Sequence, residues 1–342
     1  MSKSSPHNQR QLLNVCITLL LTLCVSACGG GGGGGDTPKV NNQASTTSID
    51  SGNAMQILAE VSAAVLGTDN LTNSVDFSNS NVTVEMNMSN PTAMHGASVT
   101  SQKALAGIII NYTPIGPETV DCYVSGTQKI WGDLNDVNTL TAGDVLNIES
   151  NMCDDGYGEV IDGLLEMTIV NIDGDINSLE FLLEVEVKFA DLMTTTDSES
   201  ISFDGDISMV IDTLAPPLEK LEVSGNSFSI NFDDKAVTMS NFLDTFIVDT
   251  STFPIAWEQS AKGSLTSSEF IGTVNYETTL TLMGTGGSYP HSGELLVTGA
   301  DGASLKLIVI DAENIQIDAD YDGDKVIDET TYITWSELEG NS

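Results

Sequence analysis

The chain has 342 residues, of which 49 are acidic and only 11 basic, so its formal net charge at pH 7 is −38. Nucleic-acid binding requires a cationic surface that neutralises phosphates, and this composition excludes it. Hydrophobic residues make up 40% of the chain and charged residues 18%. That is enough apolar material for a folded core, and it argues against a disordered chain.

The first 27 residues have the pattern of a secretory signal peptide. The early charges, Lys3 and Arg10, are both positive, and an almost wholly apolar run follows from Leu12 to Val25. This run is too short to span a bilayer of about 30 Å as a stable helix. The sequence Val-Ser-Ala-Cys then ends at Cys28. The alternative is an ordinary cleaved signal peptide beside an incidental cysteine.

The residues that end at Cys28 resemble the lipobox of bacterial lipoproteins, in which one aliphatic and two small residues precede a cysteine. The resemblance implies that the Cys28 thiol receives a diacylglyceryl group, that the signal is cut before it, and that the new amine is acylated. Several acyl chains on one residue give stable anchoring. Because Gly29 follows instead of Asp, the resemblance also implies transport to the outer membrane. We therefore expect a membrane partner, reached through N-terminal acyl chains.

Cleavage would remove two basic residues and no acidic ones, which leaves 11 − 2 = 9 basic residues and a formal charge of 9 − 49 = −40. Apart from Cys28, the mature chain would keep Cys122 and Cys153. In an oxidising envelope such a pair usually bridges, so we expect a Cys122–Cys153 disulfide; two free thiols are the alternative.

The rest of the sequence divides into a linker and a body. Residues 28–52 start at the lipidated cysteine, continue with seven glycines and lack apolar periodicity, so we expect a flexible tether. Residues 53–342 are expected to form a single β-rich domain, with Ala215-Pro216-Pro217 as the one candidate internal boundary. Asn53 to Leu66 has apolar residues at helical spacing, which predicts one amphipathic helix.

From Val82 onward the pattern is that of β-strands, in which apolar residues alternate with polar ones or form short buried runs. A unit of an apolar residue, a polar residue and Gly recurs at uneven spacing, as in Ile161-Asp162-Gly163, and is typical of an antiparallel meander with bulges. We expect a mostly β fold, either a sandwich or a strongly curved sheet, with the helix packed on it. The expected strands are Val82–Met88, Ala104–Tyr112, Val120–Trp131, Asp144–Cys153, Val160–Ile172, Leu179–Phe189, Leu305–Ile310, Ile315–Ile317 and Tyr332–Trp335.

The most specific chemical motif is DADYDGDKVIDE, which runs from Asp318 to Glu329. Asp318, Asp320 and Asp322 alternate, Gly323 stands at the sixth position and Glu329 at the twelfth, which resembles the EF-hand calcium loop. Alternate carboxylates of such a loop can converge on one hard cation. The motif predicts a Ca²⁺ site, and a hairpin turn without metal is the alternative.

Two features depart from the EF-hand pattern: Lys325 occupies the position of an aliphatic residue, and the flanking segments have strand periodicity instead of helical periodicity. A second register of the same motif restores the aliphatic residue. Its members are Asp320, Asp322, Asp324 and Asp328, with Ile327 at the aliphatic position.

A second acidic group surrounds the cysteine pair in the sequence. It consists of Asp133, Asp136 and Asp144, followed by Asp154 and Asp155. These residues suit either a second cation site or solvated turns.

Catalytic signals are weak. His95 and His291 have no neighbouring ligand at metal spacing, and there is no G-x-S-x-G nucleophile motif. We therefore expect a non-enzymatic lipoprotein with a structural or binding role that depends on a divalent cation. One alternative is a carrier that holds an apolar ligand between helix and sheet. The other is a carbohydrate-active enzyme with paired carboxylates in a cleft lined by Trp131 or Trp257.

Several features together resemble acidic lipoproteins of Gram-negative bacteria, and this resemblance implies no activity. The features are the polyglycine tether, the Cys122/Cys153 pair, the S-G-x-L-x-x-x-G segment from Ser292 to Gly299, and a D-x-D-G-D loop from Asp320 to Asp324 that leads to T-W-x-E-L at Thr334–Leu338.

Overall fold

The computed structural model describes residues 45–66, 117–134, 141–154, 156, 159–175, 180–196, 200–232 and 235–340. Cys28, the signal peptide and the first part of the expected tether lie outside these described residues, as do the expected strands Val82–Met88 and Ala104–Tyr112. These expectations therefore stay predictions.

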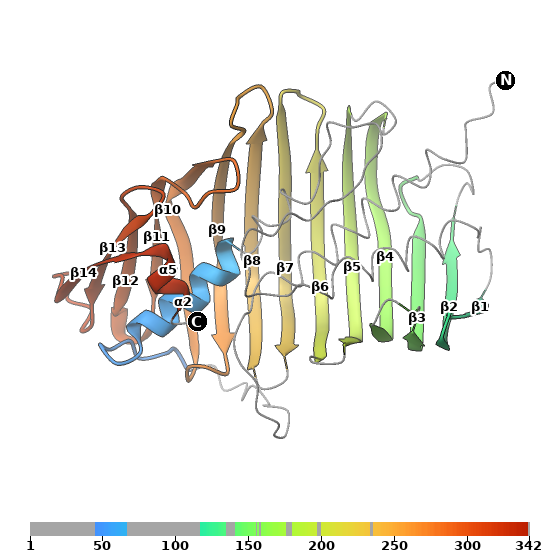
Figure 1. Ribbon diagram of the computed structural model, residues 1–342, viewed down its shortest axis with the longest axis horizontal. Coiled ribbons are helices and arrows are strands. Elements are labelled where there is room, and N and C mark those ends of the chain that lie inside the picture. Colours follow the sequence, from blue (N-terminus) through green and yellow to red (C-terminus); the bar gives the residue numbers. More distant parts are fainter. Residues whose placement is uncertain are drawn as a thin grey trace. The chain divides into compact units, whose positions relative to one another are not determined.

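The strands form one antiparallel meander, in which the order in the sheet follows the order in the sequence from β1 to β14 (Figure 1). This arrangement confirms the predicted mostly β class. The strands are β1 (Glu118–Asp121), β2 (Ser125–Asp133), β3 (Val145–Asp154), β4 (Val160–Asp175), β5 (Glu180–Thr195), β6 (Ser200–Asp212), β7 (Leu218–Phe232), β8 (Lys235–Asp249), β9 (Ala256–Ser267), β10 (Thr273–Thr285), β11 (Ser292–Thr298), β12 (Ser304–Val309), β13 (Asn314–Asp320) and β14 (Glu329–Thr334).

The chain forms two compact units, which are described separately below. The described part of unit 1 comprises residues 117–214, and that of unit 2 comprises residues 45–66 and 215–340. The division between Leu214 and Ala215 falls at the Ala-Pro-Pro segment that the sequence singles out as a candidate boundary.

Unit 1 contains β1 to β6, and the alternation of side chains along its long strands gives the sheet one buried face. In β5, Leu183, Val185 and Val187 are buried, whereas Glu186 and Lys188 between and beside them are exposed. Side chains of a strand point alternately to the two faces, so this pattern is the direct product of the period-two sequence.

A β-bulge in β4 confirms the role predicted for the apolar-polar-Gly unit at Gly163. The register with β5 shifts between Asp162 and Leu164, and Gly163 has a φ of +106°. A Cβ atom at this position would overlap the backbone carbonyl of Asp191. Glycine is therefore required there both for its conformation and for the close approach of β5.

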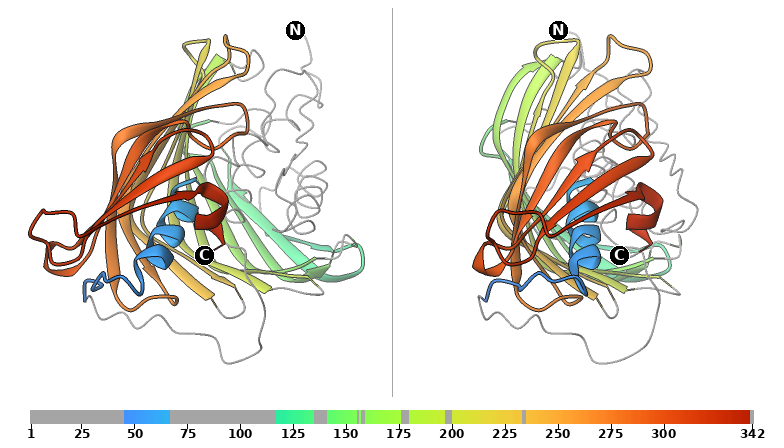
Figure 2. Two further views of the ribbon diagram at one scale, coloured as in Figure 1. Left: turned by 60° about the vertical axis from the view of Figure 1, so that its left-hand side comes forward. Right: turned by 90° about the vertical axis from the view of Figure 1, so that its left-hand side faces the viewer.

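Unit 2 contains β7 to β14 and two helices, α2 (Ala54–Leu66) and α5 (Trp335–Glu339), which contact each other on one side of the strands (Figure 2). Helix α2 also contacts β9 and β12, and its residues Ile57, Leu58 and Val61 are completely buried. The predicted helix over Asn53–Leu66 is thus confirmed, packed on the sheet. Among the described residues, no helix has the length and apolar character that crossing a bilayer requires.

A buried ion pair joins α2 to the sheet of unit 2. The Lys235 ammonium lies 2.6 Å from a carboxylate oxygen of Glu60, and both side chains are largely buried. Burial raises the pKa of Glu60, while the hydrogen bond and charge of Lys235 act in the opposite direction. The two residues are 175 positions apart.

The described structure corrects the boundary of the expected tether, which runs to Gly52 in the sequence-based interpretation. Thr47 and Ile49 are buried, and the Thr47 amide donates to the carbonyl of Thr273 at 3.0 Å. Asp50 caps the turn before α2 by accepting from the amide of Gly52. Residues 45–52 therefore belong to unit 2, since their backbone groups are bonded within it.

Two expected strands also differ from those observed. The segment expected as one strand over Val120–Trp131 forms parts of β1 and β2, and Cys122 lies in the turn between them. The last expected strand ends at Thr334, because Trp335 begins α5. That helix starts with a capping box in which the Thr334 hydroxyl accepts from the Glu337 amide and the Glu337 carboxylate accepts from the Thr334 amide.

Candidate metal centre

The connection between β13 and β14 carries the acidic motif. The two strands pair up to Ala319 and Glu329, which leaves residues 321–328 outside the ladder. Gly323 has a φ of +74°, and a Cβ atom there would overlap the carbonyl oxygen of Asp301, in the connection between β11 and β12. The glycine thus allows both the sharp turn and the close packing of the two connections.

Asp320 organises the first half of this connection. Its side chain is only 3% exposed, and its two carboxylate oxygens accept from the backbone amides of Gly323 at 2.7 Å and Lys325 at 2.8 Å. Backbone donors compensate the loss of hydration that burial imposes on a carboxylate. Asp320 therefore has a structural role in the turn, whether or not an ion is bound.

Asp328 fixes the second half of the β13–β14 connection. Its carboxylate accepts from the amide of Tyr321 at 2.8 Å, and its own amide donates to the carbonyl of Ala319 at 2.8 Å. These bonds bring Asp328 back to the end of β13. One carboxylate oxygen each from Asp320, Asp322 and Asp328 then lies within 4.8 Å of the others. We call these three residues the aspartate cluster.

The cluster matches the second register of the motif in three of its four acidic residues. The fourth, Asp324, accepts from the amide of Val326 instead. The remaining residues of the EF-hand register, Asp318 and Glu329, are also engaged elsewhere. Asp318 accepts from Gln316 and Thr330, and Glu329 accepts from the Tyr321 hydroxyl at 2.9 Å.

The physical reason is the strand ladder. Asp318 and Glu329 belong to β13 and β14, so their backbones are fixed by sheet pairing. Asp320 is the last residue of β13, and its carboxylate accepts from amides of the connection that follows. Asp318 and Glu329 thus lie outside the aspartate cluster in this structure, whereas Asp320 and Asp322, common to both registers, lie together.

The aspartate cluster has the donor chemistry that a hard divalent cation prefers. Calcium takes six to eight oxygen ligands, from carboxylates, carbonyls and water, and three carboxylates would supply only part of this shell. Asp322 and Asp328 are exposed, so water can complete it. Without a cation, three carboxylates at this spacing repel one another. Burial raises the pKa of Tyr321 to about 12, and the hydrogen bond to Glu329 and the nearby carboxylate charges add to this shift.

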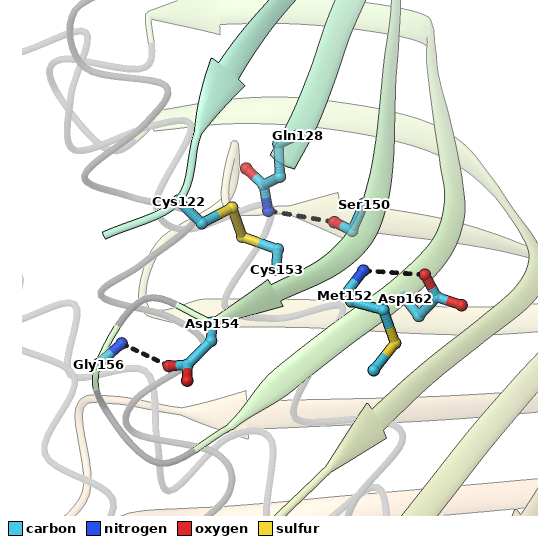
Figure 3. The surroundings of a disulfide bond; sticks show 8 residues. All are labelled: Cys122, Gln128, Ser150, Met152, Cys153, Asp154, Gly156 and Asp162. Atoms are coloured by element: carbon cyan, nitrogen blue, oxygen red, sulfur yellow. Dashed lines mark hydrogen bonds between the residues drawn. A yellow bond between two sulfur atoms is a disulfide. The ribbon is translucent and has the colours of Figure 1, made fainter. Parts of the chain in front are cut away.

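The second predicted site, the disulfide, is present in unit 1. Cys122 and Cys153 are bonded, with their Cα atoms 5.5 Å apart (Figure 3). The bond fastens the turn between β1 and β2 to the end of β3. The amide of Val124 also donates to the carbonyl of Asp154 at 2.9 Å, next to the bridge. The sequence-based prediction of this pair is confirmed.

The acidic residues near the disulfide do not gather into a cluster among the residues that the structure describes. Asp144 is buried and accepts from both the amide and the hydroxyl of Thr141, as a turn residue does. Asp154 accepts from the amide of Gly156 (Figure 3). Asp133 is exposed at the end of β2, and Asp136 and Asp155 lie outside the described residues. The observed bonds favour the turn interpretation over a second cation site.

Three of the residues considered for catalysis, His291, Trp131 and Trp257, lie in the described structure. His291 is an exposed residue between β10 and β11, and His95 lies outside the described residues. Trp257 is buried, stacks on Phe246 with ring centroids 5.6 Å apart, and donates to the carbonyl of Gly286. It is therefore a core residue and does not present its face to a sugar ring.

Comparisons with protein-family models, curated proteins and solved structures find no match. The class that fold and site define is thus an antiparallel β-sheet protein with one disulfide and an acidic candidate metal centre.

Proposed function

We propose that this chain is an envelope lipoprotein, anchored to the outer membrane through acylated Cys28, whose structural or binding role depends on a divalent cation. The lipobox supports the proposed location at the outer membrane, and the Cys122–Cys153 bond fits an oxidising compartment. The observation that carries the cation dependence is the convergence of Asp320, Asp322 and Asp328 within 4.8 Å.

The proposed role of the cation is to hold the β13–β14 connection in one conformation. This connection packs on the β11–β12 connection through Gly323, so its order extends to the neighbouring turn. Without a cation the three carboxylates of the aspartate cluster repel one another, and a bound Ca²⁺ would attract all three. A binding surface built from these connections would then form only at millimolar calcium, the range of extracellular calcium modules.

Thermal unfolding of the purified full chain tests this proposal. For a dissociation constant of about 1 mM, 10 mM calcium stabilises the folded state by about 1.4 kcal/mol. A chain of this size should then melt about 2–5 °C higher. Asp322→Asn should abolish the rise, because it removes one of the three carboxylates, while the amide oxygen of asparagine can still accept from the Asp324 amide as Asp322 does.

Asp324→Asn is the matched control. It removes one charge from the same connection, but Asp324 lies outside the aspartate cluster. This variant should keep the calcium response. An unchanged melting temperature in the parent chain, or an equal response in the two variants, would contradict the cation-dependent role. Mass spectrometry of the mature N-terminus tests the lipid anchor separately, through the mass of acylated Cys28.

A further inference from the structure

Three connections of unit 2 lie at the same end of its strands: β9–β10, β11–β12 and β13–β14. In an antiparallel meander, alternate connections share one end, and these three connections consist of residues 268–272, 299–303 and 321–328. We call this the loop end. Figures 1 and 2 show the segment that precedes α2 running beside these connections.

The N-terminal segment enters unit 2 at the loop end. The Thr273 amide donates to the carbonyl of Ser45 at 3.0 Å, and the Ala300 amide donates to the carbonyl of Thr47 at 2.6 Å. Gly302, in the same connection as Ala300, is packed against Gly323. The first described residue of the chain is thus held among the connections of the loop end.

Large aliphatic side chains are exposed at the tips of this end. Ile271 is 88% exposed, Val326 63% and Ile327 48%. Lys325 directly precedes the last two, is exposed, and forms no ion pair with any residue that the structure describes. Aliphatic side chains beside a lysine suit the boundary between lipid headgroups and acyl chains, where the ammonium contacts phosphates.

The length of chain before Ser45 limits how far the loop end can lie from a lipid anchor. Sixteen residues, 29–44, separate Cys28 from Ser45, so the link spans at most about 60 Å. The opposite end of unit 2 also exposes an aromatic residue, Phe253. It lies a further strand length away, about 50 Å for the fifteen residues of β8. To bring that end to the bilayer the link would have to be almost fully extended, whereas a flexible link of this length has a root-mean-square length of about 20–24 Å. The link therefore favours contact of the loop end with the bilayer.

We propose that the loop end of unit 2 lies against the lipid bilayer, with Ile271, Val326 and Ile327 in the headgroup region. This inference rests on the proposed anchor at Cys28. It adds an orientation: the Phe253 end of unit 2 points away from the membrane that holds the chain.

Charge sets the lipid composition that this contact requires. The loop end carries the aspartate cluster as well as Asp301 and Asp324, so anionic headgroups repel it. Zwitterionic headgroups do not, and their phosphates accept from Lys325. Bringing three unpaired carboxylates close to the bilayer costs desolvation free energy, and calcium on the aspartate cluster would reduce that cost, so the contact should be closer with calcium than with a chelator.

Site-directed fluorescence on the full acylated chain tests the orientation. The chain is placed in phosphatidylcholine vesicles that contain 5 mM calcium, and a polarity-sensitive dye is attached at Ile271→Cys, Ile327→Cys or Phe253→Cys. The native Cys122 and Cys153 are protected by their bond. A quencher attached to the lipid headgroup region should remove about half of the fluorescence at the first two positions and leave that of the Phe253→Cys label almost unchanged.

Equal quenching at all three positions, or quenching only at the Phe253→Cys label, would overturn the orientation. The outcome is separable from the proposed function. If the chain is acylated and its melting temperature responds to calcium while none of the labels is quenched, only the orientation fails. If the loop-end labels are quenched equally with calcium and with a chelator, and calcium leaves the melting temperature unchanged, the orientation stands and the cation dependence fails.

Discussion

Replacing Lys235 with methionine should destabilise unit 2 strongly, because it leaves Glu60 buried without its cation. The Glu60–Lys235 pair spans 2.6 Å and connects α2 to the first residue of β8. Removal of one partner from a buried ion pair costs about 3–5 kcal/mol, since the remaining charge keeps its desolvation penalty. Methionine fills the space of the lysine stem, so the loss reports the charge and not a cavity.

A matched control is the partly exposed pair of Lys220 and Glu222, whose charged atoms lie 2.8 Å apart. Lys220→Met should change the free energy of unfolding by about 0–1 kcal/mol, because solvent screens this pair. The double variant Glu60→Leu with Lys235→Met should recover most of the stability lost by Lys235→Met, as apolar replacements of buried pairs are often neutral.

The pH dependence has a definite sign. Burial raises the folded-state pKa of Glu60 above its ordinary value of 4.5, so the folded state binds more protons than the unfolded state above that pH. The contribution of Glu60 to stability therefore falls as pH rises from about 4.5 through the folded-state pKa. Without Lys235 the pKa of Glu60 rises further. The deficit of Lys235→Met should thus be small near pH 4 and largest at pH 7.

Urea unfolding followed by tryptophan fluorescence, with linear extrapolation to water, measures these differences. A loss below about 1 kcal/mol for Lys235→Met at pH 7 would refute the reasoning, because it would place the pair in the class of exposed ion pairs. An equal loss at pH 4 and pH 7 would refute the assignment of the effect to the charge of Glu60.

Three further substitutions test local features by the same unfolding assay. Cys122→Ser should cost about 2–5 kcal/mol, and reduction of the parent chain should reproduce the loss. Thr334→Ala should cost about 1 kcal/mol, because it removes the hydroxyl that caps α5; an unchanged midpoint would speak against the capping box. Gly163→Ala should cost more than about 1 kcal/mol through its positive φ and its overlap with Asp191, and a stabilising effect would contradict the bulge geometry.

Much of the fold was predictable because its dominant signals are local. The alternation of Leu183, Val185 and Val187 with charged residues needs no tertiary information to indicate a half-buried strand. The start of α5 had a local signal as well, since Thr334 and Glu337 have the spacing of a capping box. The sequence-based interpretation missed it because the apolar pattern of Tyr332–Trp335 continued that of a strand.

The parts that escaped prediction depend on long-range geometry. The acidic motif fits two registers in part, and only the folded structure shows that Asp320, Asp322 and Asp328 converge while Glu329 is paired with Ala319. The tether boundary was placed too late because Ser45–Ile49 is polar and carries no periodic signal. Its order comes from contacts with Thr273 and Ala300, more than 200 residues away. The partners Glu60 and Lys235 are likewise distant in sequence.

The excess of acidic residues is in part a consequence of how this meander makes its turns. Asp249, the last residue of β8, accepts from the hydroxyl and the amide of Ser251, and these bonds lower the pKa of its carboxyl. Asp311, after the end of β12, accepts from the amides of Glu313 and Asn314, which lowers the pKa of its carboxyl as well. Asp144 and Asp50 act in the same way at other turns. Short acidic side chains suit turns because they replace the missing strand partner. The large number of acidic residues in this chain is therefore in part a consequence of its many turns. What distinguishes Asp320 from these turn residues is that two further carboxylates converge beside it.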